Sequence, residues 1–454
     1  MLALVQRAAL AICRFDPRFA RALMGASHGW STDRAHYMQR SQRRLAELLQ
    51  HFTHTGLLNS QVLPACAGTP ASCQLDELPV LSRQALQELF PLLEARYQGS
   101  RQAVLDTSSG STGEPIRFYR PRDPGLEARA HQYLMLLKLN WRPGVRRICL
   151  WGSERHVGDP VQEPRGLSGL ISNVRIFGNL APGISGYRQF LDAVTASPGC
   201  AVYGYAGLLE ECARLMLERG WSLPRGAVST AWSGAEMLLA QQRELFRQAF
   251  NVKLRDLYGS RECPWIAAEC ACGTRHISPR YIVEALSERT WRAVPEGEVG
   301  SLAVTDLYAR CTPFIRYLIG DLGAVAWRDC ACGHRGFCLT ELHGRAADVI
   351  ELPSGARISG VFVPHLVEKC MGVQRAQVVR LGETSFQLRY IGDQLDAVTQ
   401  EKLKRIMRAN FEGAEAQVVR VSELQTSSRG KARLFLDLRS RAHAEVPANQ
   451  LQIA

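Results

Sequence analysis

A run of small and hydroxyl-bearing residues, Thr-Ser-Ser-Gly-Ser-Thr-Gly-Glu-Pro, occupies positions 107–115. Small residues let the backbone curl tightly, so that several N–H groups can point at one anion. Hydroxyl groups on five of the first six positions add hydrogen-bond donors. The run is not a Walker A loop, because no Gly-Lys-Ser/Thr sequence ends it. A strand-like segment follows it, which is unusual for a flexible linker. We expect this loop to bind the phosphates of a nucleotide.

Two Cys-x-Cys-Gly pairs are the second group of residues that could do chemistry. They occupy positions 270–273 and 330–333, and His276 follows the first pair. Soft thiolates and an imidazole are the ligands that tetrahedral zinc prefers. The alternative is a set of unrelated reduced cysteines. We predict a structural zinc site, because four protein ligands would leave no position for water.

A largely parallel α/β domain is expected to carry both groups. Short apolar runs at 148–151 and 201–203 read as buried strands, and amphipathic helical patterns follow Tyr205 and fill 238–250. Such alternation of strands and helices is typical of a parallel sheet. Earlier in the chain, 35–58 reads as a helix.

A second, smaller domain is expected after a Gly-rich, charged stretch near 343–360. The patterns there predict a small α+β domain of about 100 residues. Its elements are expected to be a strand at 376–381, a strand at 386–391, a helix at 395–411, a strand at 416–421, a polar loop at 426–430 and a strand at 432–438. We therefore divide the chain into domains 1–343 and 344–454, with a zinc knuckle inserted at 263–338. The tail after Arg439 is expected to be weakly ordered.

Composition limits the classes of function. The chain has 454 residues, 46% hydrophobic and 22% charged, which is ordinary globular composition and implies two or three domains. No apolar run approaches the roughly 20 residues of a membrane helix. The net charge of +12 suits anionic ligands such as ATP, or reflects a mildly basic protein. Basic residues are scattered, which argues against nucleic-acid binding. The 14 cysteines, without a signal peptide, indicate a reducing compartment and a cytoplasmic location.

The loop at 107–115 resembles the phosphate-binding motif of the adenylate-forming superfamily, which includes acyl-CoA synthetases, luciferases and peptide-synthetase adenylation domains. Within it, the chain most resembles the phenylacetate-CoA ligase branch and its capsule-associated relatives. Five further segments resemble the family's motifs in the family's order: Trp232-Ser233-Gly234-Ala235-Glu236, Tyr258-Gly259-Ser260-Arg261-Glu262, Arg316-Tyr317-x-x-Gly320-Asp321, Gly344-Arg345-x-x-Asp348 and Gly430-Lys431. The resemblance covers residues 105–435. It implies a large adenylation domain of several subdomains, joined by a hinge to the small one.

The resemblance also implies roles for single residues. The residues expected to contact ATP or AMP are Thr107, Ser108, Ser109, Gly110, Ser111, Thr112, Gly113, Gly234, Ala235, Glu236, Tyr258, Gly259, Ser260, Arg261, Asp321 and Arg345. Ser109 to Gly113 would hold the β- and γ-phosphates. Tyr258 would stack on adenine, near the segment 234–236, and Asp321 would accept hydrogen bonds from the ribose hydroxyls. Arg345 would support the ribose and phosphates.

Two residues are expected to act on the reacting groups. Glu262 would bind Mg²⁺, which prefers oxygen ligands. Lys431, in a polar loop of the small domain, would bridge the attacking carboxylate and the α-phosphate. Such catalysis consists mostly of positioning and charge stabilisation.

For the zinc site, similar clusters in the phenylacetate-ligase branch favour Cys270, His276, Cys330 and Cys332 as ligands. Cys272 is the reserve ligand. Cys263 and Cys338 are expected to lie outside the site.

The sequence departs from the family pattern at three places. Arg261 stands where the family usually has Ser or Thr, so it could contact phosphate itself or indicate a different acyl acceptor. Ala347 replaces a common acidic residue at the hinge. Gly204-Tyr205-Ala206 resembles the family's Gly-Tyr-Pro-Ser segment without Pro-Ser.

The function implied is ATP- and Mg²⁺-dependent adenylation of an aryl or acyl carboxylic acid, followed by domain rotation and transfer to CoA. A second reading passes the acyl or AMP group to a carrier protein, an amine or a hydroxyl. A third is a non-catalytic, zinc-bearing binding protein. A homodimer would suit the branch.

Overall fold

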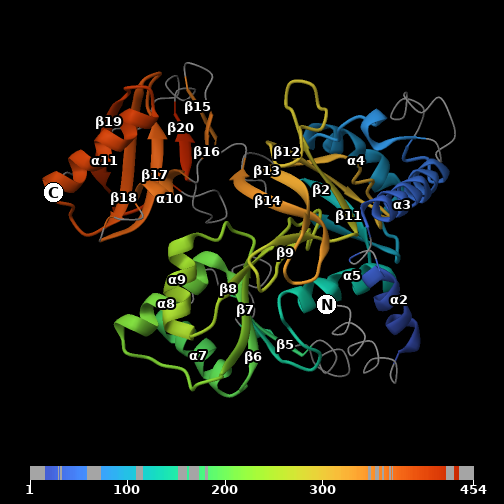
Figure 1. The fold of residues 1–454 in the computed structure, drawn as a ribbon, viewed down its shortest axis with the longest axis horizontal. Helices are drawn as coiled ribbons and strands as arrows, with labels where there is room; N and C mark the ends of the chain where they lie inside the picture. The colour runs from blue at the N-terminus through green and yellow to red at the C-terminus, as the bar shows by residue number, and fades with distance from the viewer. Residues whose placement is uncertain are drawn as a thin grey trace. The chain divides into compact units, whose positions relative to one another are not determined.

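The computed structural model describes residues 16–28, 30, 33–58, 73–108, 116–151, 161–162, 173–178, 183–345, 349–352, 357–359, 362–367, 370, 372–425 and 434–438. The chain divides into two compact units, Met1–Leu342 and His343–Ala454. Each unit is described by itself (Figure 1). The mixed α/β class predicted from the sequence is confirmed.

Helices and one hairpin form the first part of the large unit. The elements are α2 (Pro17–His28), α3 (Arg34–His54), the 3-10 helix η1 (Leu75–Glu77), α4 (Arg83–Tyr97), β1 (Ala103–Thr107), β2 (Arg117–Pro121) and α5 (Gly125–Lys138). Asp33 and Ser82 begin α3 and α4, because their side chains accept hydrogen bonds from backbone N–H groups of the first turn. Antiparallel pairing of β1 with β2 brings the two ends of the predicted phosphate loop together.

A parallel group of strands follows. Its elements are β3 (Arg147–Leu150), β4 (Val161–Gln162), β5 (Val174–Phe177), α7 (Gly183–Thr195), β6 (Cys200–Tyr205), α8 (Ala206–Glu218), β7 (Val228–Gly234), α9 (Ala240–Phe250) and β8 (Leu254–Tyr258). Strands β5, β3, β6, β7 and β8 pair in parallel in that order. The expected strands and helices between 148 and 250 are therefore confirmed, and the carboxyl ends of the parallel strands meet at one edge.

Antiparallel strands extend the same sheet. They are β9 (Ala267–Glu269), β10 (Arg275–Ile277), β11 (Tyr281–Leu286), β12 (Val299–Asp306), β13 (Tyr317–Asp329) and β14 (Arg335–Arg345). Over the described residues, the sheet has twelve strands in the order β11-β12-β13-β14-β10-β9-β8-β7-β6-β3-β5-β4. The antiparallel strands β11 to β14 thus join the parallel strands through β10 and β9.

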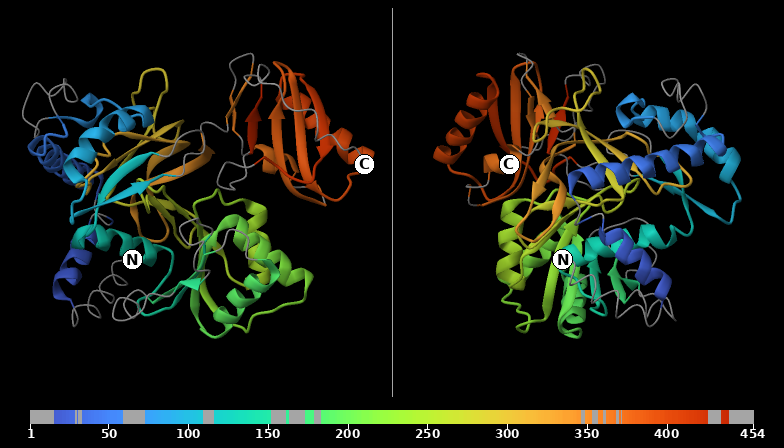
Figure 2. Two further views of the ribbon diagram at one scale, coloured as in Figure 1. Left: turned by 180° about the vertical axis from the view of Figure 1, so that it is seen from behind. Right: turned by 45° about the vertical axis from the view of Figure 1, so that its right-hand side comes forward.

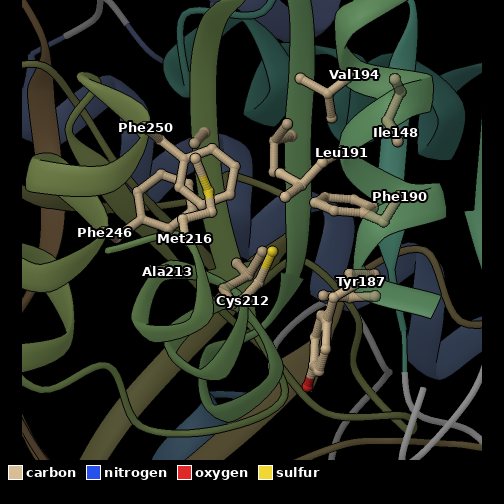
Figure 3. Packing of buried hydrophobic residues seen from close by; sticks show 14 of the residues in the cluster. Ile148, Tyr187, Phe190, Leu191, Val194, Cys212, Ala213, Met216, Phe246 and Phe250 are labelled. Atoms are coloured by element: carbon tan, nitrogen blue, oxygen red, sulfur yellow. The ribbon is translucent and has the colours of Figure 1, made fainter. Parts of the chain in front are cut away.

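Helices cover both faces of the parallel strands. On α8, Leu209, Cys212, Ala213 and Met216 share one face at helical spacing and are buried with residues of α7, α9 and the strands. Figure 3 shows the stacked rings of Phe246 and Phe250 beside Met216, and the ring centroids lie 4.1 Å apart. On the other face, apolar residues of α2 and α5 are buried with Ala201, Trp232 and Ala268. This packing fixes the strand ends that carry the candidate site.

The small unit contains a four-stranded sheet. Its elements are β15 (Val349–Glu351), β16 (Arg357–Ser359), α10 (Phe362–Val367), β17 (Val373–Arg380), β18 (Ser385–Gly392), α11 (Ala397–Asn410), β19 (Glu415–Arg420) and β20 (Phe435–Asp437). The sheet order is β19-β18-β17-β20, and α11 lies along this sheet (Figure 2). Leu403 and Met407 of α11 are buried with Phe386 of β18. The predicted strand-strand-helix-strand-strand order is confirmed. The polar loop at 426–430 and the tail lie outside the described residues.

Two further expectations can be compared with the structure. No described helix is both long and apolar enough to cross a membrane. Eleven described cysteines are free. Cys73 is the exception to the reduced state expected for the cysteines, because it is disulfide-bonded.

Candidate active site and metal cluster

The stem of the predicted phosphate loop is closed by hydrogen bonds. Thr107 ends β1, and the amide of the next residue, Ser108, donates to the carbonyl of Ile116 at 2.8 Å. Asp106 is buried, with 2% of its surface exposed, and its Oδ1 accepts from the Thr107 amide at 2.8 Å. Residues Ser109 to Gly113, which are predicted to bind phosphate, lie outside the described residues. The structure thus defines the base from which the loop starts.

Arg261 connects this base to the turn after β8. Its Nη1 donates to the carbonyl oxygen of Thr107 at 2.9 Å, and its Nε lies 3.7 Å from Oδ1 of Asp106. Arg120 of β2 forms a second ion pair with Asp106. One buried carboxylate therefore orients two guanidinium groups at the start of the loop. The Arg261 side chain stays 31% exposed, so it remains accessible to a ligand.

Tyr258 and Asp321, which the sequence assigns to adenine and ribose, lie in contact. The Tyr258 hydroxyl donates to Oδ2 of Asp321 at 2.8 Å, and both residues are buried. Tyr258 ends β8 and Asp321 lies within β13. Segments 63 residues apart in the chain therefore present the two side chains together. Orientation of a buried carboxylate by a tyrosine hydroxyl is a common way to prepare it for a ligand hydroxyl.

Glu262, the predicted magnesium ligand, follows in the same turn. Its Oε1 accepts a hydrogen bond from the hydroxyl of Tyr317 at 3.3 Å. Burial raises the pKa of Tyr317 above its ordinary value, and the negative charge of Glu262 adds to this effect. The turn needs a glycine at position 259, because a Cβ there would lie 2.7 Å from the amide nitrogen of Trp265. The backbone of residues 258–262 is therefore held in one conformation.

Arg316 does not point at the expected nucleotide site. It is 3% exposed, forms an ion pair with Glu284 at 3.1 Å, and donates to the carbonyl oxygens of Leu78 and Trp291 at 2.6 and 2.9 Å. These contacts tie η1 and the turn after β11 to β13. In the motif Arg-Tyr-x-x-Gly-Asp, the arginine thus stabilises the scaffold.

Glu236 contacts the start of α8. Its Oε2 accepts from the amide of Gly207 at 2.8 Å, where a carboxylate is stabilised by the helix dipole. Ala235 beside it has a left-handed backbone with φ of 66°. The contact of this segment with adenine stays a prediction.

Aromatic residues that the sequence did not predict to lie together meet at the carboxyl ends of β3, β6 and β7. The rings of Trp151 and Tyr205 meet edge to face at 4.5 Å, and those of Tyr203 and Trp232 stack at 5.2 Å. Burial raises the pKa of Tyr205 to about 12, aided by the charge of Glu236 and opposed by that of Arg261. In open α/β sheets, ligands bind at the carboxyl ends of the parallel strands.

Further sequence predictions fall outside what the structure describes. Lys431 and Asp348 lie outside the described residues, as does Ala347. Arg345 belongs to β14 by its backbone, and its side chain is not described. The catalytic lysine and the hinge therefore rest on the sequence.

The predicted zinc ligands come together. The ligand atoms of Cys270, His276, Cys330 and Cys332 all lie within 4.8 Å of one another. Sγ of Cys270 is 3.8 Å from Sγ of Cys330, and Sγ of Cys332 is 3.4 Å from Nε2 of His276. Tetrahedral zinc, with bonds of about 2.3 Å to sulfur and about 2.0 Å to nitrogen, requires separations of about 3.8 and 3.5 Å. The donor set therefore fits zinc in both chemistry and spacing.

Two similar turns supply the three cysteine ligands, and His276 lies in β10. One joins β9 to β10, where the Cys270 amide donates to the Thr274 carbonyl at 3.0 Å; the other joins β13 to β14, where the Cys330 amide donates to the His334 carbonyl at 2.9 Å. Each turn contains a glycine with positive φ, Gly273 at 84° and Gly333 at 78°. The Cys-x-Cys-Gly spacing predicts these turns because the glycine is required at the same place in each.

The remaining cysteines near the cluster differ in position. Cys272, the reserve ligand, is exposed. Cys338, expected outside the site, is not one of the four ligands but lies beside one: its Sγ is 3.4 Å from Nδ1 of His276. A metal-binding histidine usually uses its second ring nitrogen in this way. Burial, with the charge of Lys138, lowers the pKa of His276 to about 3, which keeps the imidazole neutral, as a metal ligand must be.

Comparisons with known proteins point to one group of enzymes. No family model matches the chain. A phenylacetate-coenzyme A ligase of Thermus thermophilus is 25% identical over 292 residues, which cover 61% of this chain and 62% of that protein. The match thus spans less than two thirds of the relative's length.

Solved structures share the fold. A 2-hydroxyisobutyryl-CoA ligase in its postadenylation state, in complex with an acyl-AMP, has a TM-score of 0.72 at 17% identity, covering 91% of this chain and 92% of the other. An anthranilate CoA ligase in complex with anthranoyl-AMP has a TM-score of 0.54 at 16% identity, covering 72% and 64%. ATP-bound MatB from Rhodopseudomonas palustris has a TM-score of 0.53 at 16% identity, covering 72% and 66%. The resemblance to adenylate-forming ligases is confirmed, and the chain has their fold.

Proposed function

We propose that this protein is an adenylate-forming ligase that uses ATP and Mg²⁺ to convert a carboxylic acid into an acyl-AMP. The observation that carries the proposal is the hydrogen bond between Tyr258 and Asp321. Arg261 and Glu262 lie in the turn that follows Tyr258. Four residues for which we propose nucleotide-binding roles lie on β8, its following turn and β13.

The chemistry requires little from the protein beyond positioning and charge. A carboxylate oxygen of the acid attacks the α-phosphorus, a new P–O bond forms, and the bond to the departing pyrophosphate breaks. Negative charge on the phosphoryl oxygens is stabilised by the loop, by Mg²⁺ at Glu262 and by a lysine. Lys431, from residues 344–454, would supply that lysine.

Transfer of the acyl group to CoA is the second proposed step. Support comes from the ligases with which the chain shares its fold and from the relative named as a CoA ligase. The two units would reorient so that the acceptor thiol replaces Lys431 at the acyl-AMP. A carrier-protein thiol, an amine or a hydroxyl is the alternative acceptor.

The acid is proposed to be an aryl or acyl acid. The aromatic residues Trp151 and Tyr205, at the carboxyl ends of β3 and β6, support an apolar acid. Apolar lining with few polar groups is typical of a small-molecule site.

Zinc is proposed to occupy the cluster of Cys270, His276, Cys330 and Cys332 in a structural role. The spacing of the donor atoms supports it. When bound, the metal would join the two turns without taking part in the reaction, because four protein ligands fill a tetrahedral site.

ATP–pyrophosphate exchange tests the proposal. Purified protein is incubated with Mg²⁺, ATP, labelled pyrophosphate and a panel of aryl and acyl acids. Exchange that requires both an acid and Mg²⁺ is expected. Absence of exchange with every acid would favour a non-catalytic binding protein. Acyl-AMP formation without a thioester on adding CoA would favour the alternative acceptors.

A further inference from the structure

A buried lysine lies against the cysteine cluster. Lys138, the last residue of α5, is 5% exposed, and its Nζ donates a hydrogen bond to Sγ of Cys332 at 3.3 Å. The two residues are 194 positions apart in the chain. Burial of an ammonium group is costly unless a negative charge and hydrogen bonds compensate it. The sulfur of Cys332 is the atom that accepts the hydrogen bond of this group.

The surroundings of Lys138 contain little else that could compensate it. The ring of Trp30, which is 1% exposed, lies 5.2 Å from Nζ. The hydrogen-bond acceptor of Lys138, Cys332, belongs to the cluster that also contains Cys270 and Cys330. Among the described residues, no carboxylate forms an ion pair with this lysine. Its counter-charge is thus the cysteine cluster itself.

Formal charges explain the pairing. Zinc bound by three thiolates and one neutral imidazole has a net charge of about minus one. A single buried ammonium cancels this charge. Without a metal, neutral thiols would leave Lys138 without a counter-ion.

We infer that Lys138 is the counter-ion of the metal-loaded cluster and that it increases the affinity of the cluster for zinc. The inference rests on the zinc site proposed above. Lys138 is a positioning residue in this role, because it acts on the metal through Cys332. It also joins α5 to the β13–β14 turn, so that metal binding and packing of this helix depend on each other.

The direct test measures zinc affinity in competition with a chromophoric chelator under reducing conditions. Lys138→Met is expected to weaken zinc binding about 10- to 100-fold, the range for loss of an outer partner of a metal ligand. Lys138→Arg keeps the charge and is expected to lose less. Lys253→Met is the matched control: this lysine lies near the Cys270 turn, but its side chain is 51% exposed and pairs with Glu269, so zinc binding should not change.

A double-mutant cycle separates charge from packing. Cys270→His gives a cluster of two thiolates and two imidazoles, which is neutral with zinc and retains the Cys332 acceptor. In this background, Lys138→Met should reduce zinc affinity by less than about threefold. Equal losses in both backgrounds would overturn the counter-ion role. If Lys138→Met alone fails to fold, recovery of folding in the double variant, followed by far-UV circular dichroism, supports the same conclusion, and failure of both variants overturns it.

The outcomes also distinguish the inference from the zinc proposal. Wild-type protein without measurable zinc affinity would overturn both. Wild-type protein that binds zinc, with Lys138→Met binding it equally well, would overturn the inference alone. Cobalt substitution gives an independent readout, because the sulfur-to-cobalt charge-transfer band should shift in Lys138→Met but not in Lys253→Met.

Discussion

The guanidinium of Arg261 donates a hydrogen bond to the main-chain carbonyl of Thr107, with 2.9 Å between Nη1 and the oxygen. This bond joins the first residue of the phosphate loop to the residue before Glu262. The resemblance to adenylate-forming enzymes led us to expect Ser or Thr at this position. A longer side chain can reach the loop where a short hydroxyl cannot. Arg261 therefore holds the base of the loop at a fixed distance from the turn that carries Glu262.

Arg261→Ser should lower kcat/KM for ATP about 10- to 100-fold, because a charged hydrogen bond contributes about 1.5–3 kcal/mol. Pyrophosphate exchange at varied ATP concentration measures it. Arg247→Ser is the control, since Arg247 pairs with Glu244 on the exposed face of α9 and should behave as wild type. Wild-type kinetics in Arg261→Ser would show that the loop does not depend on this bond.

The contact between Tyr258 and Asp321 predicts that substitution of Asp321 weakens ATP binding more than substitution of Tyr258. Asp321→Ala removes the carboxylate expected to bind ribose and should weaken ATP binding about 100-fold, while Tyr258→Phe removes one hydrogen bond and should cost about 0.5–1.5 kcal/mol. Binding of ATP by titration calorimetry measures both. In the double variant, the Tyr258→Phe effect should shrink, because its partner is absent. Additive effects would argue against coupling of the two residues.

Lys431→Ala should reduce acid-dependent pyrophosphate exchange by about 10²–10³, the scale of losing one contact to transition-state charge. This prediction comes from the sequence alone. Lys402→Ala, on the exposed face of α11 in the same unit, should exchange at the wild-type rate. A full exchange rate in Lys431→Ala would mean that another cation stabilises the α-phosphate.

Elemental analysis should find about one zinc per chain. Cys330→Ser and His276→Ala should lose the metal and unfold at lower temperature, because the two turns are then unconnected. Cys272→Ser should retain both metal and stability, since Cys272 is exposed. Metal loss in Cys272→Ser would instead make Cys272 a ligand.

His131 predicts a dependence of stability on pH. It is 1% exposed, and burial, with the nearby Arg40, Arg280 and Arg44, lowers its pKa well below 6.5. Below about pH 6.5, the unfolded chain binds a proton at this site that the folded protein does not, so stability falls as pH falls. The contribution is about 1.4 kcal/mol between about pH 7.5 and about pH 5.5. Urea unfolding over this pH range should show a smaller fall in the free energy of unfolding for His131→Gln than for the wild type.

Local patterns predicted the parts of the site that are encoded within a few residues. The Cys-x-Cys-Gly pairs predicted two turns that bring sulfurs together, and the resemblance to the phenylacetate-ligase branch favoured Cys270, Cys330 and Cys332 among them. The spacing of apolar residues along the chain likewise predicted β3, β6, α8 and α11. These features depend on residues close together in the chain.

Partners that act through long-range packing could not be predicted. Lys138 ends α5 after a run of apolar residues, and nothing near it in sequence indicates a thiol 194 residues away. The contact of Cys338 with His276 is set by pairing of β10 with β14, and that of Glu236 with Gly207 by the parallel order of β6 and β7. Such contacts follow from sheet topology.

The pairing between β10 and β14 has a consequence for how the large unit unfolds. It consists of two residue pairs, Arg275 with Leu339 and His276 with Cys338, yet in the sheet it connects the strands β11 to β14 with all the others. The metal ligands lie at this same junction, from both of its sides. Cooperative unfolding of the whole sheet therefore depends on the two residue pairs between β10 and β14. With the cluster disrupted, the parallel and antiparallel halves are free to melt as separate calorimetric transitions.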